Sequence, residues 1–191
     1  MVLFVLLCSS LVVSVDAASM WSQTYGGEGI DVACSLVATS DGGYAIAGEI
    51  GFAMAALVKT DAFGNMQWNK TYGASWGVAY SVVATSDGGY AIAGVWDCSS
   101  DLWFFDMIFS SGDAWLVKTD ALGNMQRNRT YGGTGADVAR SLVATTDGGY
   151  AIAGTYDYAM DIFYSNRGDF WLVKTMKTGF FQSTPHGLFP H

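Results

Sequence analysis

Histidine, proline and charged residues are scarce in this sequence. The 191 residues include two His, two Pro and nine Lys and Arg together, and only 14% of them are charged. Both histidines, His186 and His191, lie at the end of the chain. This scarcity argues against catalytic arrangements that need a base with a pKa near neutrality, such as Ser-His-Asp or Cys-His sites. It also argues against a His/Cys metal cluster.

Positive charge is in short supply, and the formal net charge is −8. An acidic surface repels a phosphate backbone, which excludes nucleic acid as a partner. The same charge disfavours binding to anionic membrane surfaces. The chain nevertheless does not resemble a disordered one, because 51% of its residues are hydrophobic, enough for a folded domain with a core.

A hydrophobic run long enough to span a bilayer is also missing. The run at residues 2–15 is shorter than the roughly 20 residues that a transmembrane helix needs. Val15-Asp16-Ala17 follows it and offers small residues for cleavage. Residues 1–17 are therefore predicted to be a secretory signal peptide, which makes the protein secreted or cell-surface and leaves it without a transmembrane helix after cleavage. No Lys or Arg precedes the run, so an uncleaved N-terminal anchor is the alternative.

Cysteine is rare, with three residues in the chain. Cys8 falls in the predicted signal peptide. Cys34 and Cys98 could pair in an oxidising compartment. They occupy different repeats at positions that do not correspond, so two unpaired thiols are the preferred interpretation.

Internal repetition is what the sequence has in abundance. Thr-Tyr-Gly opens three copies, at Thr24, Thr71 and Thr130, and each copy continues through Asp-Gly-Gly-Tyr-Ala-Ile-Ala-Gly to Leu-Val-Lys-Thr. Such self-similarity is typical of repeat architectures. We expect a repeat domain at residues 18–178, with copies at about 24–70, 71–129 and 130–178, followed by a degenerate tail at 179–191.

Each copy is predicted to be a four-stranded meander. In the first copy the strands are expected at residues 35–39, 44–48, 55–60 and 66–72, with Asp41-Gly42-Gly43 as the first hairpin turn. The first two strands are apolar and rich in Ala, whereas the fourth carries Gln67, Asn69 and Lys70. This polarity gradient is that of a propeller blade, with its first strand inside and its fourth at the rim. The predicted fold is all-β: a propeller-like array of three four-stranded antiparallel blades, as an open arc or partial propeller.

The phase and number of the copies raise the question of closure. Residues 20–25 match the fourth strand at 66–72, while the third copy has residues 181–185 in that place, with Pro185 interrupting any ladder. The leading strand is therefore predicted to complete the last blade. Propellers typically have about 4–8 blades, so three suggest self-association into a six-bladed ring, an open arc, or part of a longer protein.

The repeat resembles one found in secreted archaeal and bacterial propeller-like proteins. The likeness covers roughly residues 21–175 and rests on TSDGGYAIAG, WLVKTDALGN and MQWNKTYGG, read across the copies. Proteins with this repeat often carry general labels such as cell-surface protein, lipoprotein or endoglucanase-like. A looser likeness to quinoprotein-type propellers rests on the turn and strand from Asp61 to Trp68. Arg127 replaces that Trp in the second copy, and Met176 replaces the Asp in the third, so no quinone cofactor is inferred.

Carboxylates are the abundant reactive groups. Asp41, Asp87 and Asp147 recur at the hairpins and are interpreted as turn residues. The loops between the second and third strands differ most among the copies and combine acids with aromatic rings. That mixture suits carbohydrate binding, and its oxygens could hold Ca²⁺. Packing of the loops on each other is the preferred interpretation, because large aromatic side chains mostly serve packing or interfaces. The candidate ligand-binding residues are Trp96, Asp97, Trp103, Asp157 and Tyr164.

Three functional hypotheses remain open from the sequence. The leading one is a non-enzymatic extracellular binding or scaffold module of unknown ligand, with a carbohydrate or a surface protein as the expected partner. The second is a carbohydrate-active hydrolase, with Asp101, Asp106 and Asp161 as candidate catalytic carboxylates. The third is a truncated, inactive fragment of a longer propeller. Asn69 and Asn128 begin glycosylation sequons at equivalent repeat positions.

Overall fold

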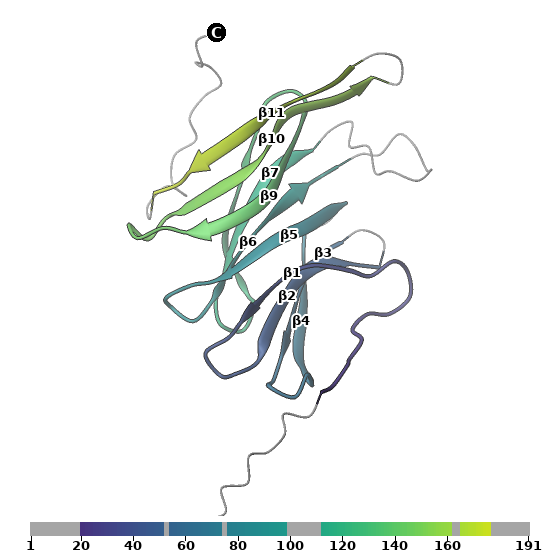
Figure 1. Cartoon of the computed structure of the whole chain (residues 1–191), viewed down its shortest axis with the longest axis vertical. Coiled ribbons are helices and arrows are strands. Elements are labelled where there is room, and N and C mark those ends of the chain that lie inside the picture. Colours follow the sequence, from purple (N-terminus) through teal and green to yellow (C-terminus); the bar gives the residue numbers. More distant parts are fainter. Residues whose placement is uncertain (1–19, 52–53, 74–75, 99–111, 162–164, 177–191) are drawn as a thin grey trace, which may run out of the picture.

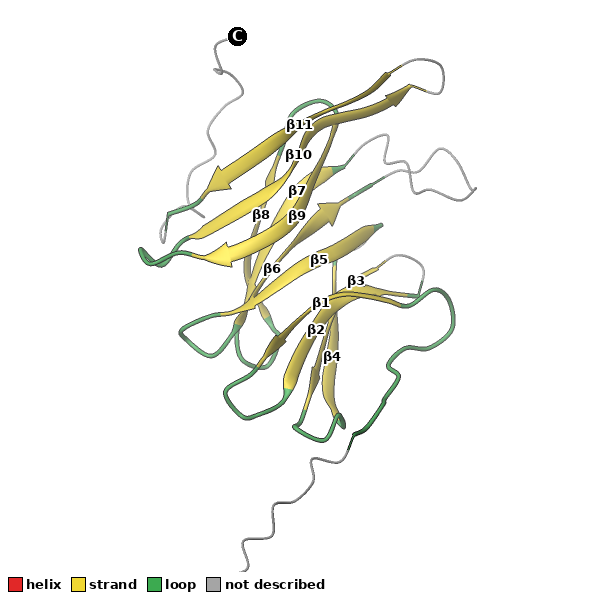
Figure 2. Ribbon diagram, in the orientation of Figure 1, coloured by secondary structure: helices red, strands yellow, loops and turns green. Residues whose placement is uncertain are grey.

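The computed structural model describes residues 20–51, 54–73, 76–98, 112–161 and 165–176. Within these ranges the chain is all-β and forms three antiparallel sheets of four, four and three strands, none of them closed (Figures 1 and 2). The sheets follow one another along the chain as an open arc. The predicted fold class, a propeller-like array of blades in an open arrangement, is confirmed.

Each repeat forms one sheet, which we call a blade. Blade 1 comprises β1 (Val32–Ala38), β2 (Tyr44–Ile50), β3 (Met54–Thr60) and β4 (Met66–Tyr72). Blade 2 comprises β5 (Gly77–Ala84), β6 (Tyr90–Trp96), β7 (Asp113–Thr119) and β8 (Met125–Tyr131). Blade 3 comprises β9 (Ala136–Ala144), β10 (Tyr150–Asp161) and β11 (Ser165–Lys174). Strands are hydrogen-bonded in sequence order within every blade, and no fourth strand pairs with β11 in the described part of blade 3.

A lysine ties the first hairpin of each blade to its third strand, and this lysine is buried in blades 1 and 2. In blade 2, Asp87 accepts hydrogen bonds from Thr85 Oγ1 at 2.5 Å and from the Gly89 amide at 3.2 Å. Lys118 reaches this carboxylate at 2.9 Å and also donates to the Thr119 carbonyl at 2.6 Å. Lys59–Asp41 and Lys174–Asp147 repeat the pair in blades 1 and 3. The three aspartates are turn residues, as predicted, and they also compensate the lysine charges.

The Asp87 carboxyl should make the unfolding free energy depend on pH. Hydrogen bonds from Thr85 and Lys118 lower its pKa to about 2. Because the folded chain ionises this group at lower pH than the unfolded chain does, its stabilising contribution is complete above about pH 4 and disappears as the pH falls through about 2. Asp87→Asn should therefore flatten the acid limb of the stability curve, measured by urea unfolding between those pH values.

The charge-matched control is Asp169→Asn, which removes an exposed carboxylate from β11. It should keep the acid limb of the wild-type protein. An Asp87→Asn variant with the same slope as wild type would contradict the assigned ion pair.

Consecutive blades pack face to face, and this packing forms the core. The back face of a blade is the one turned toward the next blade in the chain, and the front face is the opposite one. β5 lies against β1, β2 and β3, and β9 lies against β5, β6 and β7. Ala47 and Leu57 on the back of blade 1 share one buried cluster with Ile92 and Val117 on the front of blade 2. The first strands are thus at the inner edge, while β4 and β8 are largely exposed.

Polar contacts set the alignment of each blade on the next. Ser35 Oγ accepts a hydrogen bond from the Val82 amide at 3.3 Å, and Ser81 Oγ accepts one from the Leu142 amide at 3.1 Å. On the outer side, Tyr72 at the end of β4 donates its hydroxyl to the Gly123 carbonyl of blade 2 at 2.9 Å. A side chain bonded to the next blade's backbone requires one relative position of the two sheets.

Tyr72 and Tyr131 occupy the same repeat position but differ in hydrogen bonding. The Tyr131 hydroxyl is buried and has no partner in the part of the chain that the structure describes. Tyr72→Phe should destabilise the protein by about 1 kcal/mol, because the Gly123 carbonyl loses its donor. Tyr131→Phe should be neutral or slightly stabilising, because it removes an unsatisfied hydroxyl. Denaturant unfolding measures the free energy of unfolding of both variants. An equal loss of stability in the two variants would contradict the assigned hydrogen bonding.

The leading segment, residues 20–25, does not complete the last blade of its own chain. It pairs with no strand in the described chain, and it lies on blade 1, while blade 3 is at the other end of the arc (Figure 1). Trp21 packs on Tyr44, with ring centroids 6.1 Å apart, and Tyr25 donates to the Gly64 carbonyl at 2.6 Å. The segment therefore does not complete blade 3 within its own chain, which leaves the open arc among the predicted arrangements. Three blades do not bring residues 20–25 and β11 together (Figure 1).

Candidate functional site

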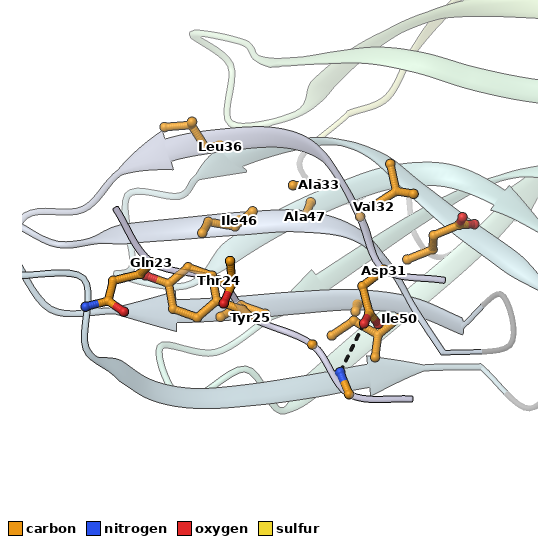
Figure 3. Close-up of a pocket in the computed structure, with 16 residues that line it drawn as sticks. Gln23, Thr24, Tyr25, Asp31, Val32, Ala33, Leu36, Ile46, Ala47 and Ile50 are labelled. Carbon is orange, nitrogen blue, oxygen red and sulfur yellow. Dashed lines mark hydrogen bonds between the residues drawn. The ribbon is translucent and has the colours of Figure 1, made fainter. Parts of the chain in front are cut away.

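The front face of blade 1 is hollowed into a cavity of about 690 Å³. One wall is the backbone and side chains of residues 23–27, which cross the face, and the other is the sheet itself. Figure 3 shows Thr24 and Tyr25 on this segment, opposite strands that carry Leu36, Ile46 and Ala47. The lining is thus mainly apolar and comes from β1, β2 and β3.

The cavity exists because no blade precedes blade 1 in the described chain. Leu36 is 64% exposed, whereas its repeat equivalents Val82 and Leu142 are 5% and 3% exposed under the blade before them. The hollow is deepened by Ala56, which stands where blades 2 and 3 have Trp115 and Trp171. The front face of blade 1 is therefore open to solvent, whereas the equivalent faces of blades 2 and 3 are part of the core.

Asp31 organises the polar end of the cavity. Its carboxylate accepts hydrogen bonds from the Gly27 amide at 3.0 Å, drawn in Figure 3, and from the Gly51 amide at 3.0 Å. These bonds hold the 26–30 link against the β2–β3 turn. Because both carboxylate oxygens are used on backbone, the role that these contacts support is structural, and the apolar wall is the binding feature of the cavity.

A second group of side chains lies along the inner edge of the arc. The first strand of every blade has an irregular register, between Ala33 and Ser35 in blade 1 and at the corresponding points in blades 2 and 3. The bulged residues are Cys34, Tyr80 and Arg140, and the Arg140 guanidinium lies 4.4 Å from the Tyr80 ring centroid. Bulges commonly re-aim a side chain.

Glu49 lies near this inner row. Its side chain is 6% exposed, one carboxylate oxygen has no partner in the described part of the chain, and burial raises its pKa. Sequence reasoning missed the row because strand one was placed from Ser35 onward. The sequence did carry a signal: this position holds three dissimilar residues between an Ala and a Ser that all three copies share.

Acidic residues gather at the loop end between blades 2 and 3. Asp137 accepts hydrogen bonds from the Gly133 and Asp157 amides at 2.7 and 2.9 Å, and burial raises its pKa. Burial also raises the pKa of Asp113, with further contributions from Asp137 and Asp97. Asp97 and Asp157 share one repeat position and have φ of 53° and 52°. No three or more His, Cys, Asp or Glu side chains in the described ranges are placed to hold a metal ion.

The predicted ligand-binding and catalytic residues are only partly in view. Trp96 is half-buried, lies 4.8 Å from Trp115 between ring centroids, and packs against the core shared by blades 1 and 2. Asp97 and Asp157 belong to the loop-end group just described. The backbone of Asp161 ends β10. The remaining candidates fall outside the described residues: Asp101, Trp103, Asp106 and Tyr164.

The two predicted sequon asparagines occupy the outer strands. Asn69 lies on β4 and Asn128 on β8, and both are exposed. Their position at the rim leaves room for a glycan on either blade, so the structure is compatible with modification there.

Cys34 and Cys98 are free thiols, which is the preferred interpretation of the sequence. Cys98 is buried, and this burial raises its pKa to about 11. Iodoacetamide at neutral pH should therefore label the exposed Cys34 and leave Cys98 unmodified until the protein is denatured, because the thiolate is the nucleophile. Peptide mass spectrometry before and after denaturation reads this out. A disulfide-linked peptide, or native labelling of Cys98, would contradict the assignment.

A scan against protein-family models finds no matching family, and a search of curated proteins finds no match. Among the described residues, no helix has the length and apolar character needed to cross a membrane.

Proposed function

We propose that the protein is an exported, non-enzymatic binding or scaffold module that binds through the open front face of blade 1. The observation that carries the proposal is the exposure of Leu36 at a position that is core in blades 2 and 3. Burial of apolar area is the main favourable term in protein association. A face already shaped to receive a β-sheet is therefore suited to receive one from a partner.

The character of the face favours a protein surface over a small polar ligand. Its wall is formed by aliphatic side chains such as Leu36, Ile46 and Val58, and its Asp31 carboxylate is occupied by backbone amides. Large exposed apolar patches on soluble proteins commonly mark interaction sites. Export, predicted from residues 1–17, places such a partner outside the cell or on its surface.

Charge on the face should abolish binding without unfolding the protein. We choose Leu36→Asp, because an exposed strand position tolerates the change at about 1 kcal/mol or less. The wild-type chain from residue 20 onward should either bind the dye anilinonaphthalene sulfonate as a monomer or associate through this face. Leu36→Asp should lose whichever property the wild type shows. Leu122→Asp, at an exposed apolar residue in the β7–β8 turn, is the matched control and should behave as wild type.

A wild-type chain that is monomeric and binds no dye would overturn the proposal, since the face would then be covered by the chain itself. Circular dichroism and thermal melting confirm that each variant is folded. Turnover would overturn the non-enzymatic part of the proposal: release of sugars from a polysaccharide that is lost in Asp161→Asn would favour the hydrolase instead.

A further inference from the structure

We propose that the partner of the open front face is the back face of blade 3 in a second copy of this chain, and that two copies close head to tail into one ring of six blades. This inference rests on the proposed function, because it names the occupant of the same face. Inside each chain, the back face of one blade packs on the front face of the next, and this interface occurs twice. The two ends of the arc expose one front face and one back face of the same kind.

The back of blade 3 is open in the same way as the front of blade 1. Leu172 is 72% exposed, whereas its equivalents on the backs of blades 1 and 2, Leu57 and Leu116, are fully buried. Val143 on β9 is 53% exposed. Ser141 is exposed at the position where Ser35 and Ser81 each accept a hydrogen bond from the following blade. These side chains are exposed because no further blade packs on the back face of blade 3 in the described chain.

The sizes of the facing side chains are reversed at the two open ends. Inside the chain, a small residue on one back face meets a large residue on the next front face: Ala55 shares a cluster with Trp115, and Ala114 shares one with Trp171. At the ends, the back face of blade 3 carries Phe170, which is fully exposed, and the front face of blade 1 carries Ala56 at the floor of its cavity.

Phe170 and Ala56 thus form a pair of one large and one small residue, as at the internal junctions, but here the large residue is on the back face. A Trp at position 56 would collide with a Phe at position 170 of a neighbour, and Ala at both would leave a void. Phe170 of a second copy would enter the cavity on blade 1 above Ala56. This complementarity favours a second copy over an unrelated partner.

The leading segment supplies the missing strand. Trp21 and Tyr25 contact the Gly64 turn of blade 1 as Trp68 and Tyr72 of β4 contact the Gly123 turn of blade 2. Residues 20–25 therefore stand where the fourth strand of a preceding blade would stand. Blade 3 has no fourth strand in the described chain, and its β11 edge is unpaired there. The segment of one copy is in place to pair with β11 of the other.

The number of copies follows from blade counting. One chain provides three blades, below the range of about 4–8 found in closed propellers, and three chains would provide nine. Two copies provide six. Because front meets back, the contact is heterologous, and such contacts form a ring when the rotation closes.

The repeat register specifies a crosslink. Leu57 pairs with Lys70, and Leu116 with Arg129, across the third and fourth strands. The equivalent pair across two copies is Leu172 with Gln23. Paired Cα atoms lie within disulfide range, so Gln23→Cys with Leu172→Cys, made together with Cys34→Ser, should oxidise to a covalent dimer. Gln23→Cys with Leu122→Cys is the control and should stay uncrosslinked. Within one chain, residues 20–25 and β11 lie at opposite ends of the arc (Figure 1).

Two variants that each break one half of the interface test the head-to-tail arrangement. By light scattering after size exclusion, wild type should be a discrete dimer. Leu36→Asp and Phe170→Asp should each weaken association at least about 100-fold, because a charge is buried without a partner. Mixed together they should form a heterodimer, since the intact front of the Phe170→Asp chain meets the intact back of the Leu36→Asp chain.

The failures are distinguishable. A monomer that binds anilinonaphthalene sulfonate would overturn the second-copy proposal and leave the open face available to another partner, so the proposed function would stand. A monomer without dye binding would overturn both. Open-ended polymers, or a mixture of the two variants that stays monomeric, would overturn the closed two-copy ring.

Discussion

Face-to-face packing of consecutive blades is the interaction on which the structure depends. A four-stranded antiparallel sheet of this size cannot bury both of its apolar faces alone, so each blade gains its core from its neighbours. The same contacts recur at both internal junctions: aliphatic side chains at the centre and a serine hydroxyl bonded to the next blade's backbone at the inner edge. The lysine–aspartate pairs then hold the hairpins of every blade in the shape that this packing requires.

The same dependence creates the candidate functional site. A stack of identical interfaces has two ends, and here each end exposes the side chains that are core in the interior. Natural repeat proteins usually cover their end units with polar residues, because an open end invites association. This chain instead keeps Leu36 exposed at one end and Phe170 and Leu172 at the other. Binding is assigned to the ends of the arc because both end faces stay apolar. In addition, the large residue of the facing pair, Phe170, is on the back face and the small one, Ala56, is on the front face.

Several elements could be predicted from the sequence, because they depend on short-range patterns. The blades follow from the repeat, the hairpin turns follow from Asp-Gly-Gly, and the exposure of β4 follows from its polar residues. The bulge at Cys34, Tyr80 and Arg140 was not predicted, because strand one was expected from residue 35 whereas β1 begins at Val32, although the variation at that position was visible. The role of Trp96 could not be decided from the sequence, because an aromatic residue beside a variable loop can contact a ligand or pack on its neighbours. In the structure it packs on Trp115.

The sequence by itself determined the local units of this protein: how many blades there are, where each turn lies, and which strand is outermost. These features depend on residues a few positions apart and on a repeat that can be aligned with itself. Only the tertiary structure decided where the leading segment lies and which two blade faces remain open. Both depend on how the blades are arranged in space. The repeated sequence places apolar side chains at the ends as it does in the interior, so only the packing shows which of them are left without a neighbour.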